Sequence, residues 1–366
     1  MEKKRIVVKI GSSSLTNDYG EIDEAKLQDH VEALANLKLL GHEVLLVSSG
    51  AVAAGFKRLG YQTRPVTLKG RQAAAAVGQS LLIQSYIAQF DAYDVMPAQI
   101  LVTRDDFTNR ARFKNAYETM SELLERNILP IINENDTVSV RELTFGDNDM
   151  LSALVAGFMK ADQLIILTDV NGLYTDNPMT NPNAKKINVL TSISDDLLLC
   201  ANEEGSKVGT GGMKSKLLAA KTALKVGIPV FIGTGEGKEK LVDIVDGKGD
   251  GTYLLNEQHN TITINQQWIA MHAKAVGQIY IDAGAEAAIL YNSKNLLPAG
   301  ITKFEGKFNK GDIVEVFGKN GLIGKGEVTI SAKELAATVG KKTCEQTERV
   351  KKGQAEVIHR SKWVVI

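Results

Sequence analysis

Short apolar runs rich in β-branched residues alternate with longer amphipathic stretches over residues 5–265, and this alternation is the strongest constraint on the fold. The apolar runs predict strands at Ile6–Ile10, Glu43–Val47, Met96–Leu101, Leu129–Ile132, Gln163–Leu167 and Ile228–Ile232. The amphipathic stretches predict helices at Glu24–Leu40, Gln72–Phe90, Phe113–Arg126, Met150–Met159 and Met213–Val226. Strands that alternate with helices of this length form parallel βαβ units whose sheet is covered on both faces. We therefore predict a three-layer α/β/α sandwich with a mainly parallel sheet in a first domain, residues 1–265.

The pattern changes towards the C-terminus. Gly233–Thr252 is rich in Gly, Lys and Asp, and we interpret it as turns around a short apolar piece. From about residue 275, glycines and charged turns separate short segments at Gln278–Ile281, Ala287–Leu290, Ile313–Phe317, Leu322–Val328 and Trp363–Ile366. This spacing predicts a second domain, residues 275–366, built as a small β-barrel-like fold with one helix at Ser331–Val339.

The composition is that of an ordinary globular protein. A length of 366 residues favours two domains. The balance of 43 basic and 43 acidic residues gives no indication of nucleic acid or of an anionic membrane as a partner. No apolar run approaches the ~18 residues that span a bilayer, and Met1–Arg5 leads directly into the first strand, without an apolar signal region. Cys200 and Cys344 match no metal or redox spacing. We expect a cytoplasmic protein.

Lys9 stands inside the first apolar strand, where a charged ammonium is costly unless an anion meets it. Gly11 and three serines follow at once. In α/β proteins, a strand end followed by Gly and hydroxyl residues presents backbone N–H groups to phosphate. Lys9 therefore suggests a phosphate partner, although on an edge strand the same side chain would extend to solvent.

Polar residues follow two further strands. Ser48–Gly50 offers small residues that let a ligand approach the backbone, but any strand–helix turn favours Ser and Gly. Asn133 and Asp136 follow the strand at Leu129–Ile132, and ligands bind outside the carboxyl ends of strands in open α/β sheets. An Asn and an Asp there could hold the ammonium and the carboxylate of a zwitterionic amino acid. The alternative is a polar turn.

Two helix starts also combine polar and charged residues. Gly146–Asp149 precedes an apolar helix, where one acidic residue would suffice as a cap. The additional Asp and Asn could orient a catalytic lysine or bind Mg²⁺. Gly209–Lys216 opens the helix that ends near Val226, and its glycines could cradle phosphates although it is not a Walker A loop. None of the five histidines lies in these loops, which argues against histidine acid–base chemistry and a zinc site. We assign no metal ligands.

Taken in order, these segments resemble the amino acid kinase family, which includes carbamate kinase and acetylglutamate kinase. The resemblance covers almost the whole chain and is carried by Val7–Ser12, Val47–Ala51, Ala76–Gln79, Ile132–Asp136, Gly146–Asp149 and Gly209–Met213. The segment from about 275, with Leu297–Ile301, resembles a PUA domain. Within the family, the segments are most similar to those of the enzymes that phosphorylate L-glutamate.

The resemblance implies a reaction of ATP with L-glutamate to L-glutamyl 5-phosphate and ADP, the first step of proline synthesis, with Mg²⁺ as metal cofactor. It implies ATP binding by Lys9, Gly11, Thr168, Asp169, Thr210, Gly211, Gly212, Met213, Lys214, Ser215 and Lys216. It implies glutamate binding by Ser49, Gly50, Asn133, Asp136 and Asn148. It also implies feedback inhibition by proline.

The implied chemistry needs no general base, because a side-chain carboxylate with a pKa of ~4.3 is already ionised at pH 7. Catalysis would consist of positioning and charge stabilisation. We assign Lys9 and Lys216 to the phosphoryl oxygens in transfer and Asp149 to the orientation of both lysines. Asp147 is assigned, more weakly, to the metal or substrate network.

Three alternatives stay open at this point. A related kinase could act on aspartate, acetylglutamate or a nucleotide, although aspartate kinases typically carry ACT domains. PUA domains often bind RNA, but the neutral charge argues against RNA as the main partner. A regulatory pseudo-kinase would not need both Lys9 and Lys216. The family suggests a homo-oligomer, a dimer or tetramer, and a reductase that receives the labile acyl phosphate is a plausible partner.

Overall fold

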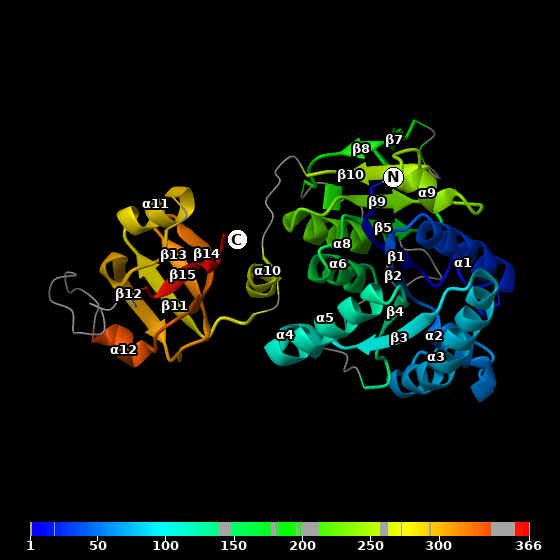
Figure 1. Cartoon of the computed structure of the whole chain (residues 1–366), viewed down its shortest axis with the longest axis horizontal. Helices are drawn as coiled ribbons and strands as arrows, with labels where there is room; N and C mark the ends of the chain where they lie inside the picture. Colours follow the sequence, from blue (N-terminus) through cyan, green and yellow to red (C-terminus); the bar gives the residue numbers. More distant parts are fainter. Residues whose placement is uncertain are drawn as a thin grey trace. The chain divides into compact units, whose positions relative to one another are not determined.

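An eight-stranded sheet forms the centre of the first of two units, residues 1–261 (Figure 1). The second unit comprises residues 262–366. The structure is a computed structural model that describes residues 2–17, 19–138, 148–176, 181, 183–194, 197–198, 212–256, 263–271, 273–292, 294–337 and 356–365.

The sheet has the strand order β3-β4-β2-β1-β5-β9-β10-β8. Its strands are β1 Arg5–Ile10, β2 Glu43–Ser48, β3 Pro97–Val102, β4 Leu129–Glu134, β5 Gln163–Leu167, β8 Val189–Leu190, β9 Val230–Gly233 and β10 Gly251–Leu254. Neighbours are parallel except for β9 and β10. The chain moves outward from β1 through β2 and returns to the other side of β1 with β5. Ligands of open α/β sheets bind at the carboxyl edge beside such a switch in strand order.

Helices cover both faces of this sheet, which explains why its central strands are apolar along nearly their whole length. Figure 1 shows α6 and α8 on one face and α1 on the other. The described helices of the unit are α1 Glu24–Leu39, α2 Ala51–Gly55, α3 Leu68–Phe90, α4 Arg104–Thr108, α5 Arg110–Glu125, α6 Asn148–Phe158, α8 Met213–Lys225 and α9 Lys240–Val245, with short 3₁₀ turns η1 Lys57–Leu59 and η2 Asp91–Tyr93. A small hairpin pairs β6 Leu173–Tyr174 with β7 Lys186–Ile187.

Helices α2 and α3 pack backbone to backbone. A Cβ atom at Gly55 would lie 2.0 Å from the carbonyl oxygen of Ala74, and one at Gly78 would lie 1.8 Å from that of Ala51. Only glycine permits this approach. The loop that precedes α2 is therefore tied closely to α3.

The second unit is a five-stranded sheet with the order β12-β11-β13-β14-β15. Its strands are β11 Gly277–Ile281, β12 Ile301–Gly306, β13 Ile313–Gly318, β14 Gly321–Val328 and β15 Ile358–Val365. Its helices are α10 Ile264–Met271, α11 Ala283–Asn292 and α12 Ala332–Ala336, with a 3₁₀ turn η3 Pro298–Gly300. Ser331 starts α12 through a capping box with Glu334. The predicted continuation of this helix to Val339 lies outside the described residues.

The predicted fold class is confirmed, and two local predictions are wrong. Ala287–Leu290 is part of helix α11, because an alanine-rich segment with an Asp282 side chain that accepts a hydrogen bond from the Ala285 N–H favours a helix start. The stretch Gly233–Thr252 contains α9 and β10 in addition to turns. Gly251 serves packing, since a Cβ there would lie 2.4 Å from the ring of Phe231, whereas Gly237 and Gly247 have positive φ angles and serve turns. Helix α3 also begins one turn earlier than predicted. No described helix is both long enough and apolar enough to traverse a bilayer.

Candidate active site

Two lysines and one aspartate meet beside the switch in strand order. Lys9 lies near the end of β1, Asp149 in the first turn of α6 and Lys216 in the first turn of α8. Lys9 Nζ is 2.5 Å from Asp149 Oδ1, and Lys216 Nζ is 3.2 Å from Asp149 Oδ2. The three residues are 5%, 7% and 0% exposed for Lys9, Lys216 and Asp149. This Lys–Asp–Lys group joins two ammonium groups to one carboxylate, so its formal charges favour a further anion.

The local sequence explains why Asp149 stands in the first turn of a helix, but it does not explain why Lys216 does. An acidic residue in the first turn of a helix is stabilised by the helix dipole, whereas a lysine in a first turn is disfavoured. The pairing with Asp149, and not helix stability, therefore accounts for the position of Lys216. The Ser215 hydroxyl donates a further hydrogen bond of 2.9 Å to Asp149 Oδ2.

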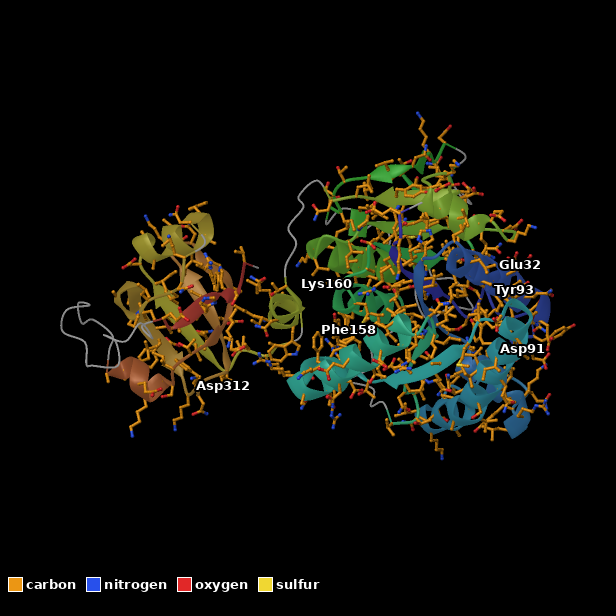
Figure 2. All side chains as sticks on the ribbon, in the orientation of Figure 1. Glu32, Asp91, Tyr93, Phe158, Lys160 and Asp312 are labelled. Atoms are coloured by element: carbon orange, nitrogen blue, oxygen red, sulfur yellow. The ribbon has the colours of Figure 1, made fainter. Side chains whose placement is uncertain are left out.

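The opposite end of α6 is anchored by aromatic packing. The ring of Phe158, labelled in Figure 2, packs edge-on against the rings of Phe107, Phe113 and Tyr117. Such contacts fix the helix axis at one end while Asp149 is held at the other. The carboxylate is thus placed by a rigid element.

Asp149 is ionised in this environment. Burial opposes ionisation, but the charges of Lys9 and Lys216 outweigh burial and hold the pKa of Asp149 below its usual value. A charged carboxylate at the centre keeps both ammonium groups oriented. The group is therefore preorganised and needs no proton transfer to become active.

A second, amide-rich cluster lies next to this group. Asn148 Nδ2 donates to Ser49 Oγ at 3.0 Å and to Asn133 Oδ1 at 2.9 Å. Asn133 Nδ2 donates to Gln79 Oε1 of α3 at 2.8 Å. The ends of β2 and β4, the middle of α3 and the start of α6 thereby meet in one hydrogen-bonded network, in which Ser48 is also fixed by the Tyr86 hydroxyl at 2.8 Å.

Asp136 follows this cluster along the chain, just beyond β4. Burial, together with the neighbouring charge of Glu134, raises the pKa of Asp136 to about 6, while Arg71 acts in the opposite direction. Two acids and one arginine therefore surround the end of β4. A site of this composition suits a ligand that carries charges of both signs.

Three glycines lie beside the residues of the two groups. A Cβ at Gly11 would lie 3.4 Å from Lys9 Nζ, and Gly50 adopts a left-handed conformation with φ of 113° before α2. Gly212 precedes the first turn of α8, which contains Met213 and the exposed Lys214. At the end of β5, Thr168 Oγ1 donates to Asp169 Oδ1 at 3.0 Å.

The structure thus brings together Lys9, Asp149, Lys216 and Ser215 in one group, and Ser49, Asn133 and Asn148 in another. Thr168 and Asp169 lie at the same edge of the sheet and, within the described part of the chain, form no hydrogen bond or ion pair with either group. Asp147, Thr210 and Gly211 lie outside the described residues. The sequence analysis did not assign Gln79, Ser48, Glu134 or Arg71 to the site, although all of these except Arg71 stand in segments that carry the family resemblance.

The described residues contain no cluster of three or more His, Cys, Asp or Glu side chains that could hold a metal ion. Asp149 is already engaged by two lysines and Ser215. Mg²⁺ commonly binds through one or two carboxylates together with substrate phosphates. This part of the chain therefore fits a Mg²⁺ ion that is carried mainly by a nucleotide.

Both units of the chain match families of known proteins. Residues 4–234 match the amino acid kinase family, and residues 277–351 match the PUA domain. The chain is 60% identical over 368 residues to glutamate 5-kinase 1 of Bacillus licheniformis, covering 100% of each. It is 58% identical over 365 residues to glutamate 5-kinase 1 of Bacillus subtilis, covering 100% of this chain and 99% of the other.

A solved structure agrees at the level of the fold. Carbamate kinase from Giardia lamblia bound to AMP-PNP matches with a TM-score of 0.51 and 18% identity, over 70% of this chain and 99% of that one. The chain belongs to the amino acid kinase family of phosphotransferases and, within it, to the glutamate 5-kinases with a C-terminal PUA domain. The family resemblance stated from the sequence is confirmed.

Proposed function

We propose that this protein transfers the γ-phosphoryl group of ATP to the side-chain carboxylate of L-glutamate. The products are L-glutamyl 5-phosphate and ADP, and the reaction commits glutamate to proline synthesis. The observation that carries the proposal is the buried Lys–Asp–Lys group at the switch in strand order, in a chain 60% identical to a glutamate 5-kinase.

The reaction forms one bond and breaks one. A carboxylate oxygen of glutamate attacks the γ-phosphorus, and the bond from that phosphorus to the bridging oxygen of ADP breaks. The attacking carboxylate is already ionised at pH 7, so no side chain has to remove a proton. Lys9 and Lys216 stabilise the negative charge on the transferring oxygens, and Asp149 orients both lysines.

The two substrates approach from different sides of this group. Ser49, Gly50, Asn133, Asp136 and Asn148 hold glutamate, with Asp136 facing its ammonium group. ATP lies against Lys9, Gly11, Thr168, Asp169 and the segment 210–216. Mg²⁺, when bound with the nucleotide, neutralises phosphate charge, and Asp147 is proposed for the metal or substrate network.

Further features are proposed from the family. Proline would inhibit the enzyme at or overlapping the glutamate site. The enzyme would act as a dimer or tetramer in the cytoplasm and could deliver its labile product to a glutamate 5-phosphate reductase. RNA binding by the PUA domain would at most be secondary to the kinase activity, given the balanced charge of the chain.

Trapping of the acyl phosphate tests the activity. The purified protein is incubated with Mg-ATP, L-glutamate and hydroxylamine, and γ-glutamyl hydroxamate is measured, with aspartate and acetylglutamate as control acids. We expect a product with glutamate only, which is lost in Lys9→Ala. Equal product with the control acids would indicate a related kinase, and no product with any acid would refute the proposed reaction.

A further inference from the structure

Arg71 lies on the glutamate side of the site and has no task in the mechanism above. Arg71, Ala75 and Gln79 follow one another at intervals of four residues on α3, which places them on one ridge of the helix. Ala75 is 2% exposed, and Gln79 accepts the hydrogen bond from Asn133 at 2.8 Å. This ridge therefore faces the end of β4.

The direction of α3 brings Arg71 towards Asp136. Helix α3 leads into β3, which is parallel to β4, and the helix of such a crossover runs opposite to its strands. Arg71 therefore lies beyond Gln79 in the same direction in which Asp136 lies beyond Asn133. The positive charge of Arg71 accordingly acts on Asp136. It opposes the rise in the pKa of Asp136 that burial and Glu134 cause.

Arg71 is also incompletely paired. Within the described residues, its Nε atom is buried without a hydrogen-bond partner. Buried donors in native proteins almost always have an acceptor, so an acceptor from a ligand is expected. Helix stability does not explain the residue either, because the first turn of α3 has no acidic residue and a cation there is disfavoured by the helix dipole.

The chemistry around the end of β4 identifies the ligand group. An α-amino acid presents an ammonium and a carboxylate on one carbon atom, and the planar guanidinium of arginine binds a carboxylate through two parallel hydrogen bonds. We propose that Arg71 binds the α-carboxylate of the substrate while Asp136 binds its α-ammonium group. This inference rests on the proposed function. Together, Arg71 and Asp136 select an α-amino acid over other carboxylic acids.

The test uses three acids that share the reacting carboxylate. Glutamate carries both α-groups, 4-aminobutyrate lacks the α-carboxylate, and glutarate lacks the α-ammonium group. For Arg71→Gln we expect the KM for glutamate to rise about 10- to 100-fold, the range that a charge-assisted hydrogen bond supports. The KM for ATP and the kcat/KM for 4-aminobutyrate stay unchanged. Arg71→Lys restores part of the loss, because an ammonium keeps the charge but not the paired hydrogen bonds.

Lys69→Gln is the matched control, since Lys69 is an exposed cation in the same helical turn. The decisive quantity is the ratio of kcat/KM between glutamate and 4-aminobutyrate. This ratio does not depend on the folded fraction, so it is valid even if a variant is unstable. A ratio in Arg71→Gln and Arg71→Lys equal to that of Lys69→Gln would overturn the inference. If the unmodified protein forms no hydroxamate with any acid, the proposed function itself fails.

Discussion

Asp149 in the first unit and Glu327 in the second are both buried acids that pair with lysine, yet their surroundings differ. Asp149 is 0% exposed and lies between Lys9 and Lys216. Glu327 on β14 is 3% exposed and pairs at 2.5 Å with Lys362 of β15, whose side chain is 35% exposed. One lysine matched to one glutamate across neighbouring strands suits a structural contact. Two buried lysines around one aspartate at a ligand-binding edge suit the binding of an anion.

The largest effect is expected from removing the carboxylate at the centre of the Lys–Asp–Lys group. Asp149→Asn leaves two buried ammonium groups facing each other, which should lower the free energy of unfolding by about 3–5 kcal/mol. It should also lower kcat by about 100-fold or more, because the lysines lose their orientation. Denaturant unfolding and steady-state kinetics measure the two effects.

The matched variant in the second unit is Glu327→Gln. It removes a buried carboxylate of similar exposure, so we expect lower stability with an unchanged kcat. If kcat fell as far in Glu327→Gln as in Asp149→Asn, the distinction between a catalytic and a structural acid would be lost.

Replacing one lysine in each unit distinguishes the two sites by kinetics alone. Lys9→Ala and Lys216→Ala should each lower kcat about 100- to 1000-fold, the usual cost of losing one donor to transition-state charge. The KM for glutamate should change little. Lys362→Ala should leave kcat unchanged. A near-normal kcat in Lys9→Ala would refute the assigned mechanism.

The pH dependence of glutamate binding should show a moderate effect. The pKa of Asp136 is raised to about 6, so its carboxylate is charged above that pH and neutral below it. The neutral form cannot attract the ammonium of glutamate, and the KM for glutamate should rise by up to about tenfold per pH unit below pH 6. Measurements between pH 5 and 7.5 test this. Asp136→Asn should have a high KM without this pH dependence, and the KM for ATP serves as the control.

The smallest effect concerns acid stability. The pKa of Asp149 is held below its ordinary value of 3.8. Its ionisation therefore stabilises the fold at any pH above that value, and this contribution is lost as the pH falls through the lowered pKa. Unfolding curves between pH 2 and 5 should be less steep in pH for Asp149→Asn than for the unmodified protein. Identical slopes would show that the ion pairs of Asp149 do not contribute to the pH dependence of stability.

The sequence contained enough information to predict the sheet and part of the site. Periodicity predicts β1 to β5 because parallel strands buried on both faces are continuously apolar. Asp149 was assigned to the orientation of Lys9 through the family resemblance, and the two side chains are in contact. Arg71 and Gln79 could not be predicted, because the face of α3 that meets β4 depends on packing and not on the pattern of α3 itself. Ala287–Leu290 was ambiguous because a short apolar run fits a strand as well as a helix.

The glycine contact between α2 and α3 couples the glutamate side of the site to the packing of two helices. The loop with Ser49 and the ridge with Arg71 belong to two helices joined at Gly55 and Gly78, whereas the transferring lysines belong to β1 and α8. A methyl group at Gly78 would lie 1.8 Å from the carbonyl oxygen of Ala51, so it would force apart the two helices that carry Arg71 and follow Ser49. A change at this contact would therefore act on the binding of the acceptor acid more directly than on phosphoryl transfer.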